Sequence, residues 1–169
     1  MGAGEVVITV ETPLQDDVAL LVAELDAAIS AQAPGTPDDF NFRLTAEDMA
    51  GADTTVWVAR IDGQAVGCGA LRLKSGGDYG EVKRMYVRPA FAGRGIGGRI
   101  LATIEAAARD AGAGYLMLET DENYGAACRV YRRAGFRPRG AFGEYPDNPY
   151  SLFMEKRLEA PQRRSAALA

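Results

Sequence analysis

Residues 81–112 read EVKRMYVRPAFAGRGIGGRILATIEAAARDAG, and this stretch decides the fold. It begins as an apolar strand and passes through a glycine-rich turn directly into a long amphipathic helix. The first N–H groups of a helix have no partner within it, and the helix dipole adds positive potential at the same place. Because glycines let a ligand approach the backbone, the turn predicts a phosphate or pyrophosphate site. The turn consists of Gly93, Arg94, Gly95, Ile96, Gly97 and Gly98.

The segments before the turn have the patterns of antiparallel strands and two helices. Asp62-Gly63 lies between two runs of alternating apolar residues and predicts a hairpin. Thr45, with Asp48 three residues later, predicts the capped start of a short helix. The expected strands are 5–11, 54–61, 64–73 and 80–87, and the expected helices are 16–32 and 46–50.

The segments after the turn alternate between helix and strand and end in a second antiparallel pair. Together with the first half they predict an α+β fold, with a mixed, mostly antiparallel sheet of about seven strands flanked by about four helices. We expect one domain over residues 1–158 and a mobile tail over 159–169, because the tail has no periodicity. The expected elements here are helix 95–111, strand 115–120, helix 124–135 and strands 136–143 and 151–158.

The composition of the chain limits where the protein can act and which catalytic and metal sites it can form. The chain has 169 residues, 47% of them hydrophobic, without an apolar run long enough for a membrane span or a secretory signal at its start. We therefore expect a cytoplasmic protein. It contains no histidine, which excludes His-based metal sites, Ser-His-Asp triads and Cys-His pairs, and no metal site is predicted. Cys68 and Cys128 have no nearby cysteine partner and are expected to be buried free thiols.

Charge is unevenly distributed along the chain. The net charge is −4, but residues 1–80 hold 4 basic and 13 acidic residues, whereas 81–169 hold 15 and 10. The basic excess starts at the glycine turn and favours a polyanionic small molecule over nucleic acid, which the acidic molecule as a whole would repel. The alternative is an ordinary solvated basic face.

Two common phosphate motifs do not account for the turn. A P-loop closes with Gly-Lys-Ser/Thr, whereas this turn closes with Gly-Gly-Arg. The spacing from Gly93 to Gly98 satisfies GxGxxG, and Glu119 ends the next strand, as in a dinucleotide-binding unit. However, residues 88–92 separate the turn from its strand, and antiparallel strands precede it. That context disfavours a dinucleotide fold.

A third interpretation rests on two motifs together. The turn reads Ala-Gly-Arg-Gly-Ile-Gly from Ala92, and a second motif runs from Tyr131 to Gly135-Phe136. With the order of elements over 5–158, they resemble the GNAT superfamily of N-acetyltransferases. That family has Arg/Gln-x-x-Gly-x-Gly/Ala at the turn and Tyr-x-x-x-Gly-Phe in the later helix. The chain departs from the family pattern at Ala92 and at the position of the usual Asn, where Tyr124 stands and Asn123 comes one residue early.

The resemblance implies acetyl-CoA as the cofactor. Its pyrophosphate would lie on the amides of residues 93–98, and its pantetheine would pair with the main chain of the preceding strand. A main-chain N–H of that strand would stabilise the oxyanion. Besides the turn, the implied cofactor contacts are Met85, Tyr86, Val87, Asn123 and Tyr124.

The resemblance also suggests catalytic roles. Tyr131 would be the general acid for the leaving thiolate, and Glu81 the general base, acting through water, with Glu119 and Glu122 as the next choices. The alternatives are a core aromatic role for Tyr131 and, for Glu81, a structural pairing with Lys83 or Arg72.

The acceptor is the least defined part. Loops 33–42, 75–79 and 143–150 are the expected walls of its site, and their acids favour a cationic primary amine of a small molecule. Two alternative functions stay open: an acetyltransferase for protein N-termini or lysines, and a non-catalytic acyl-CoA sensor. A homodimer is also possible on the sequence. The candidate acceptor contacts are Glu119, Glu144 and Tyr145.

Overall fold

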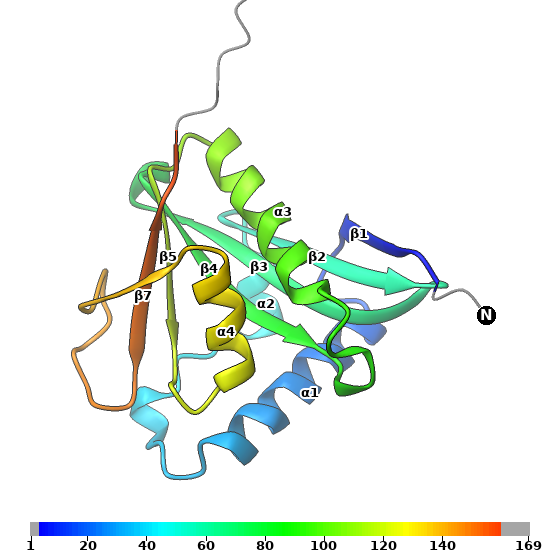
Figure 1. Cartoon of the computed structure of the whole chain (residues 1–169), viewed down its shortest axis with the longest axis horizontal. Helices are drawn as coiled ribbons and strands as arrows, with labels where there is room; N and C mark the ends of the chain where they lie inside the picture. The colour runs from blue at the N-terminus through cyan, green and yellow to red at the C-terminus, as the bar shows by residue number, and fades with distance from the viewer. Residues whose placement is uncertain (1–3, 160–169) are drawn as a thin grey trace, which may run out of the picture.

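The computed structural model describes residues 4–159, except the side chain of Ser75. These residues form a seven-stranded sheet in the order β1-β2-β3-β4-β5-β7-β6 (Figure 1). None of the helices in this range is long and apolar enough to cross a bilayer. The strands are β1 (Val6–Val10), β2 (Thr54–Ile61), β3 (Gln64–Lys74), β4 (Tyr79–Val87), β5 (Tyr115–Thr120), β6 (Arg137–Arg139) and β7 (Leu152–Arg157). The helices are α1 (Asp16–Gln32), α2 (Ala46–Met49), α3 (Ile96–Asp110) and α4 (Gly125–Arg133), with short 3-10 turns η1 (Asp38–Phe40), η2 (Ser75–Gly77) and η3 (Pro89–Phe91).

The predicted fold class is confirmed, and most elements start and end within a residue or two of their predicted bounds. The β2–β3 hairpin turns at Asp62 and Gly63, whose φ values of 50° and 80° suit this tight turn. Thr45 and Asp48 form the expected capping box. One strand prediction was too long: β6 covers three residues instead of 136–143. Pro138 has no N–H to donate, and the strand lies at the sheet edge. Of the predicted tail, residues 160–169 lie outside the described residues.

The helices cover both faces of the sheet and create two cores. Alternation along β2 divides its side chains between them: Trp57 packs in the core under α3, and Val58 in the core under α1. The α3 core includes Ile100 and Ile104, both fully buried, and the α1 core includes Leu21, also fully buried. Each helix therefore has a fixed position over the sheet, and both helices reach toward β4.

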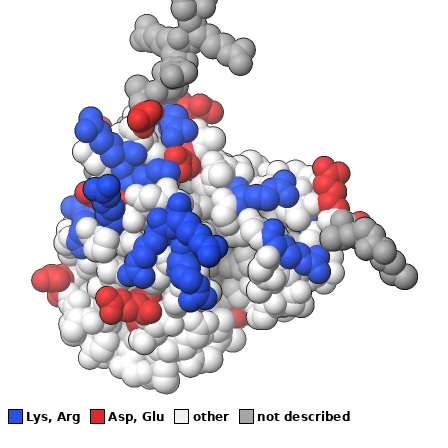
Figure 2. All heavy atoms as spheres, in the orientation of Figure 1, with Lys and Arg blue, Asp and Glu red and all other residues white. Residues whose placement is uncertain are grey.

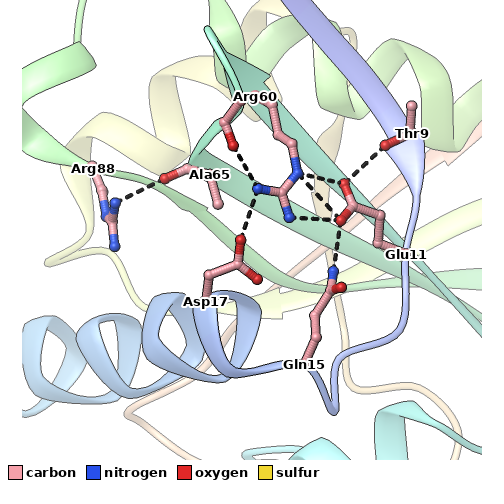
Figure 3. A network of polar contacts seen from close by, with 8 residues as sticks. Thr9, Glu11, Gln15, Asp17, Arg60, Ala65 and Arg88 are labelled. Carbon is pink, nitrogen blue, oxygen red and sulfur yellow. Dashed lines mark hydrogen bonds and ion pairs between the residues drawn. The ribbon is translucent and has the colours of Figure 1, made fainter.

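One polar network holds the first strand and α1 to the sheet (Figure 3). The Arg60 guanidinium on β2 donates to the Glu11 carboxylate at 2.7 Å and to Asp17 at the start of α1 at 2.7 Å. Gln15 donates to Glu11 at 2.6 Å. The pKa of Glu11 falls to about 2, chiefly because of its hydrogen bonds with Arg60.

β4 and β5 diverge where the predicted phosphate turn approaches. They pair in parallel only from Tyr79 to Glu81 on β4. Beyond that point β4 carries a bulge opposite β3, and Arg84 in it has a left-handed φ of 56°. A bulge bends its strand. The β5-facing edge of residues 82–87 therefore has no strand partner, and the gap opens toward the N-terminus of α3 (Figure 1).

Candidate active site

A cavity of about 660 Å³ occupies the gap between the diverging strands. Its walls come from six parts of the chain: α1, the η1 segment, β4, the glycine turn, α4 with the end of β5, and Tyr150 in the loop before β7. Lys and Arg side chains gather over α4 on the face shown in Figure 2, where Arg129, Arg132 and Arg133 lie. The predicted basic excess is thus located beside the cavity.

The glycine turn fits an anion. Gly93 and Gly95 have φ values of 77° and 73°, which L side chains rarely adopt. Helix α3 begins at Ile96, and the first N–H bonded back into the helix is that of Arg99, to the carbonyl of Gly95 at 3.1 Å. The amides before it lack a helical acceptor. A Cβ built on Gly93, Gly95 or Gly98 meets nothing within 4 Å, so the space beside these three residues is open.

Most of the predicted cofactor contacts line the cavity, but Arg94 and Asn123 do not. Arg94 is not in the cavity wall; its guanidinium lies 5.3 Å from the centre of the Phe91 ring. Asn123 is also outside the wall, and its main-chain N–H donates to the Asp121 carboxylate at 2.8 Å, at the start of α4. The predicted contacts that do line the cavity are Met85, Tyr86, Val87, Gly93, Gly95, Ile96, Gly97, Gly98 and Tyr124.

Tyr131 projects from α4 into the cavity wall and is 7% exposed. Its ring packs against Phe136, with 5.9 Å between the centroids. No hydrogen bond to its hydroxyl forms among residues 4–159, and burial raises its pKa. The two interpretations of Tyr131 are therefore compatible: its ring is part of the core, and its hydroxyl keeps a proton at neutral pH.

Glu119, at the end of β5, also lines the cavity. The Ser151 hydroxyl donates to its Oε1 at 2.9 Å. Burial raises the pKa of the Glu119 carboxyl from 4.5 to about 7, against the smaller opposing effect of that hydrogen bond. A carboxyl that titrates near neutral pH in a cavity can exchange a proton with a ligand there.

Glu81 has different surroundings. It is 2% exposed and does not line the cavity. Its Oε1 accepts a hydrogen bond from the Tyr145 hydroxyl, and the Lys83 ammonium lies 3.3 Å away. The pairing with Lys83 is present, whereas Arg72 instead binds Asp53 at 2.9 Å. Glu81 lies inside the sheet, since β4 has neighbours on both sides.

The acceptor loops are placed in part as expected. Thr36 and Phe42 of the loop after α1 line the cavity, and so does Tyr150. Glu144 and Tyr145 do not. The sequence prediction missed the α1 wall and two arginines. They come from separate segments, and no local pattern indicates that they meet. The missed residues that line the cavity include Leu25, Ile29, Arg43 and Arg84.

A diverging parallel strand pair, an open glycine turn at a helix N-terminus and a buried tyrosine beside both define an acyl-CoA-dependent N-acyltransferase. Residues 22–136 match the model of the Acetyltransferase (GNAT) family, and the chain belongs to that family. It is an acetyltransferase that uses acetyl-CoA.

Individual relatives agree with this placement. An IAA acetyltransferase from Azospirillum brasilense is 44% identical over 153 residues, covering 90% of this chain and 98% of the relative. A structure from Klebsiella pneumoniae, assigned as an acyl-CoA N-acyltransferase, is 34% identical with a TM-score of 0.74, covering 91% of this chain and 98% of that one. A GNAT family acetyltransferase from Elizabethkingia anophelis with acetyl-CoA bound shares the fold at 16% identity and a TM-score of 0.63, covering 90% and 98%.

Proposed function

We propose that the protein transfers the acetyl group of acetyl-CoA to a primary amine of a small molecule, with Tyr131 as general acid and Glu119 as general base. One observation carries this proposal. A single cavity brings together a tyrosine that keeps its proton, a carboxyl whose pKa is about 7 and the open glycine turn.

The residues that would hold acetyl-CoA are those of the turn and of the unpaired strand edge. The amides of Ile96, Gly97 and Gly98 would bind its diphosphate. The main chain of residues 85–87 would bind its pantetheine, as an added strand does. Acetyl-CoA supplies an activated acetyl group, so positioning by the chain accounts for much of the rate.

Glu119 is better placed than Glu81 to accept the proton of the incoming amine. A base works best when its pKa lies near the operating pH, and Glu119 meets this condition while facing the cavity. Glu81 is engaged by Lys83 and Tyr145, away from the cavity. We assign Glu81 the role of orienting these two side chains.

Tyr131 would protonate the leaving sulfur. Its hydroxyl makes no bond to a described residue, so a ligand in the cavity can take that bond. Replacing it with phenylalanine removes only this donor and leaves the ring packed against Phe136.

Two aromatic contacts favour a small acceptor over a protein. Phe40 of η1 lies 5.4 Å from Tyr150, and Phe42 lies 4.9 Å from Tyr145, between ring centroids. They join the loop after α1 to the loop before β7. A peptide would need a groove open at both ends, whereas these contacts bridge two loops that contribute to the cavity wall.

Thiol release from acetyl-CoA tests the proposal. We expect turnover with at least one small amine. This turnover should depend on Glu119 and Tyr131 and should not need Glu81 as a base. The panel of acceptors also includes IAA, which appears in the name of the Azospirillum relative, and peptides with free N-termini. Tight binding of acetyl-CoA without turnover across the panel would favour a sensor. Turnover of peptides alone would favour a protein acetyltransferase.

A further inference from the structure

A buried arginine in the cavity wall lacks a full set of partners. The side chain of Arg84, on the β4 bulge, is 4% exposed. Its Nη2 lies 2.6 Å from Oδ1 of Asp26 on α1. Its Nε is buried without any hydrogen-bond partner among the described residues. A buried guanidinium with an unused N–H is costly unless a ligand completes its bonds.

A second arginine shares the same carboxylate. The Nε of Arg43, in the loop after η1, lies 3.8 Å from Oδ1 of Asp26, and its Nη2 donates to the Ser30 hydroxyl at 3.1 Å. Its Nε is likewise buried without a hydrogen-bond partner among residues 4–159. Two guanidinium groups thus face one carboxylate, and Asp26 itself is 39% exposed. The pair carries one positive charge more than its partner neutralises.

Neighbouring acids do not remove this excess. Glu24, two residues before Asp26 on α1, is held by Arg88 at 2.9 Å. Glu81 is paired with Lys83. The charged side chains that line the cavity are the basic Arg43, Lys83, Arg84, Arg129 and Arg133 and the acidic Glu119 and Asp121. The walls are therefore mainly cationic, in contrast to the acidic walls expected from the loop sequences.

The wall beside the arginine pair is apolar. Leu25 and Ile29 of α1 line it, with the aromatic side chains of Phe40, Phe42 and Tyr150. A ligand that extends from Glu119 toward Arg43 would meet a proton acceptor, an apolar surface and two cationic groups. A planar carboxylate matches the fork of N–H donors that guanidinium groups offer.

We propose that the acceptor is an amino acid or a related amino-carboxylic acid with an apolar side chain, whose carboxylate is bound by Arg43 and Arg84. This inference rests on the proposed function, since it names the substrate class of the same site. Its amine would point to Glu119 and its apolar group would pack against the aromatic residues. The cavity thereby selects against polyamines, whose charge the two arginines repel.

Steady-state kinetics with matched acceptors tests the inference. L-Phenylalanine, L-phenylalanine amide and phenethylamine share a ring and an amine, but only the first carries a carboxylate; L-leucine and its amide repeat the comparison. We expect kcat/KM to be higher for the carboxylate member of each set by about 30-fold or more. Equal or higher kcat/KM for the amides, phenethylamine or spermidine would overturn the inference and leave the proposed function intact.

Arg43→Gln is the decisive variant, because Arg84→Gln removes a buried charged group and is more prone to misfold. In Arg43→Gln the preference for the carboxylate member should fall to about threefold or less. Arg157→Gln, which changes an exposed arginine outside the cavity, should keep the full preference. An unchanged preference in Arg43→Gln would overturn the assignment.

A binding measurement separates this inference from the acetyltransferase proposal. N-Acetyl-L-phenylalanine and its amide are titrated by calorimetry into the protein saturated with coenzyme A. We expect heat with the carboxylate alone, reduced in Arg43→Gln. Equal binding of both compounds, or binding of neither, would overturn the inference. The absence of thiol release with every amine would instead refute the proposed function.

Discussion

Replacing Glu119 with glutamine should stabilise the protein at alkaline pH while it removes activity. Burial raises the pKa of the Glu119 carboxyl from 4.5 to about 7. The folded state therefore holds this proton more tightly than the unfolded state. The resulting stability is fully present below pH 4.5 and is lost as the pH rises through 7. Glutamine cannot ionise, and its carbonyl oxygen can still accept the bond from Ser151.

The size of the effect follows from the pKa shift. Each unit corresponds to about 1.4 kcal/mol, so the ionised Glu119 costs the folded state about 3 kcal/mol at pH 8.5 and about 1 kcal/mol at pH 5. Urea unfolding of the ligand-free protein at both pH values measures this difference. We expect Glu119→Gln to gain stability over the wild type at pH 8.5 and little at pH 5.

Glu122→Gln is the matched control, since Glu122 is an exposed carboxylate three residues along and outside the cavity. It should change neither the stability nor its pH dependence. A stability gain in Glu119→Gln that is the same at both pH values, or a loss at pH 8.5, would refute the assigned burial and pKa of Glu119.

The same variant tests the catalytic role. In the wild type, kcat/KM, calculated for the concentration of the neutral amine, should rise with pH through about 7 as Glu119 loses its proton. Glu119→Gln should lower kcat by about 100-fold and abolish this rise. Retention of the pH profile in the variant would assign the titration to another group, and loss of the profile in Glu81→Gln would return the base to Glu81.

Three further outcomes are expected. Tyr131→Phe should lower kcat about 100-fold or more while the melting temperature hardly moves, and wild-type turnover would refute the general-acid role. Gly95→Ala should cost about 1–2 kcal/mol because its φ is 73°, whereas Gly98→Ala should fold normally but weaken coenzyme A binding in calorimetry. Unimpaired binding by Gly98→Ala would argue against the turn as the diphosphate site. Arg60→Gln should destabilise by about 1–3 kcal/mol at pH 7. That deficit should shrink as the pH falls from 4.5 through the Glu11 pKa of about 2, because a protonated Glu11 no longer forms an ion pair with Arg60. A deficit independent of pH would contradict the network.

Local patterns in the sequence predicted most of the fold. The period of apolar residues placed α1 and β5 at their observed bounds, and the Asp62-Gly63 turn predicted the β2–β3 hairpin. The glycines predicted the tight turn before α3, since backbone conformation and free amides depend on a few adjacent residues. Tyr131 was found through its motif, and the structure places it on the same cavity as the turn.

The surroundings of the carboxylates could not be predicted in this way. Glu81 and Glu119 look alike in sequence, as acids near the ends of neighbouring strands. The bonds that distinguish them come from Tyr145, 64 residues after Glu81, and from Ser151, 32 residues after Glu119. The pKa of each group depends on which distant side chains bury it.

The sequence by itself determined the helices, most of the strands and the glycine turn, because these depend on short-range periodicity and on backbone conformation. Only the tertiary structure decided which acid faces the cavity and what charge the cavity wall carries at Arg43 and Arg84. Arg43 and Arg84 reach one carboxylate, Asp26, from segments 17 and 58 residues away, and the bulge in β4 opens the space between them and Glu119. Chain packing brings these groups together, and no local pattern records that contact.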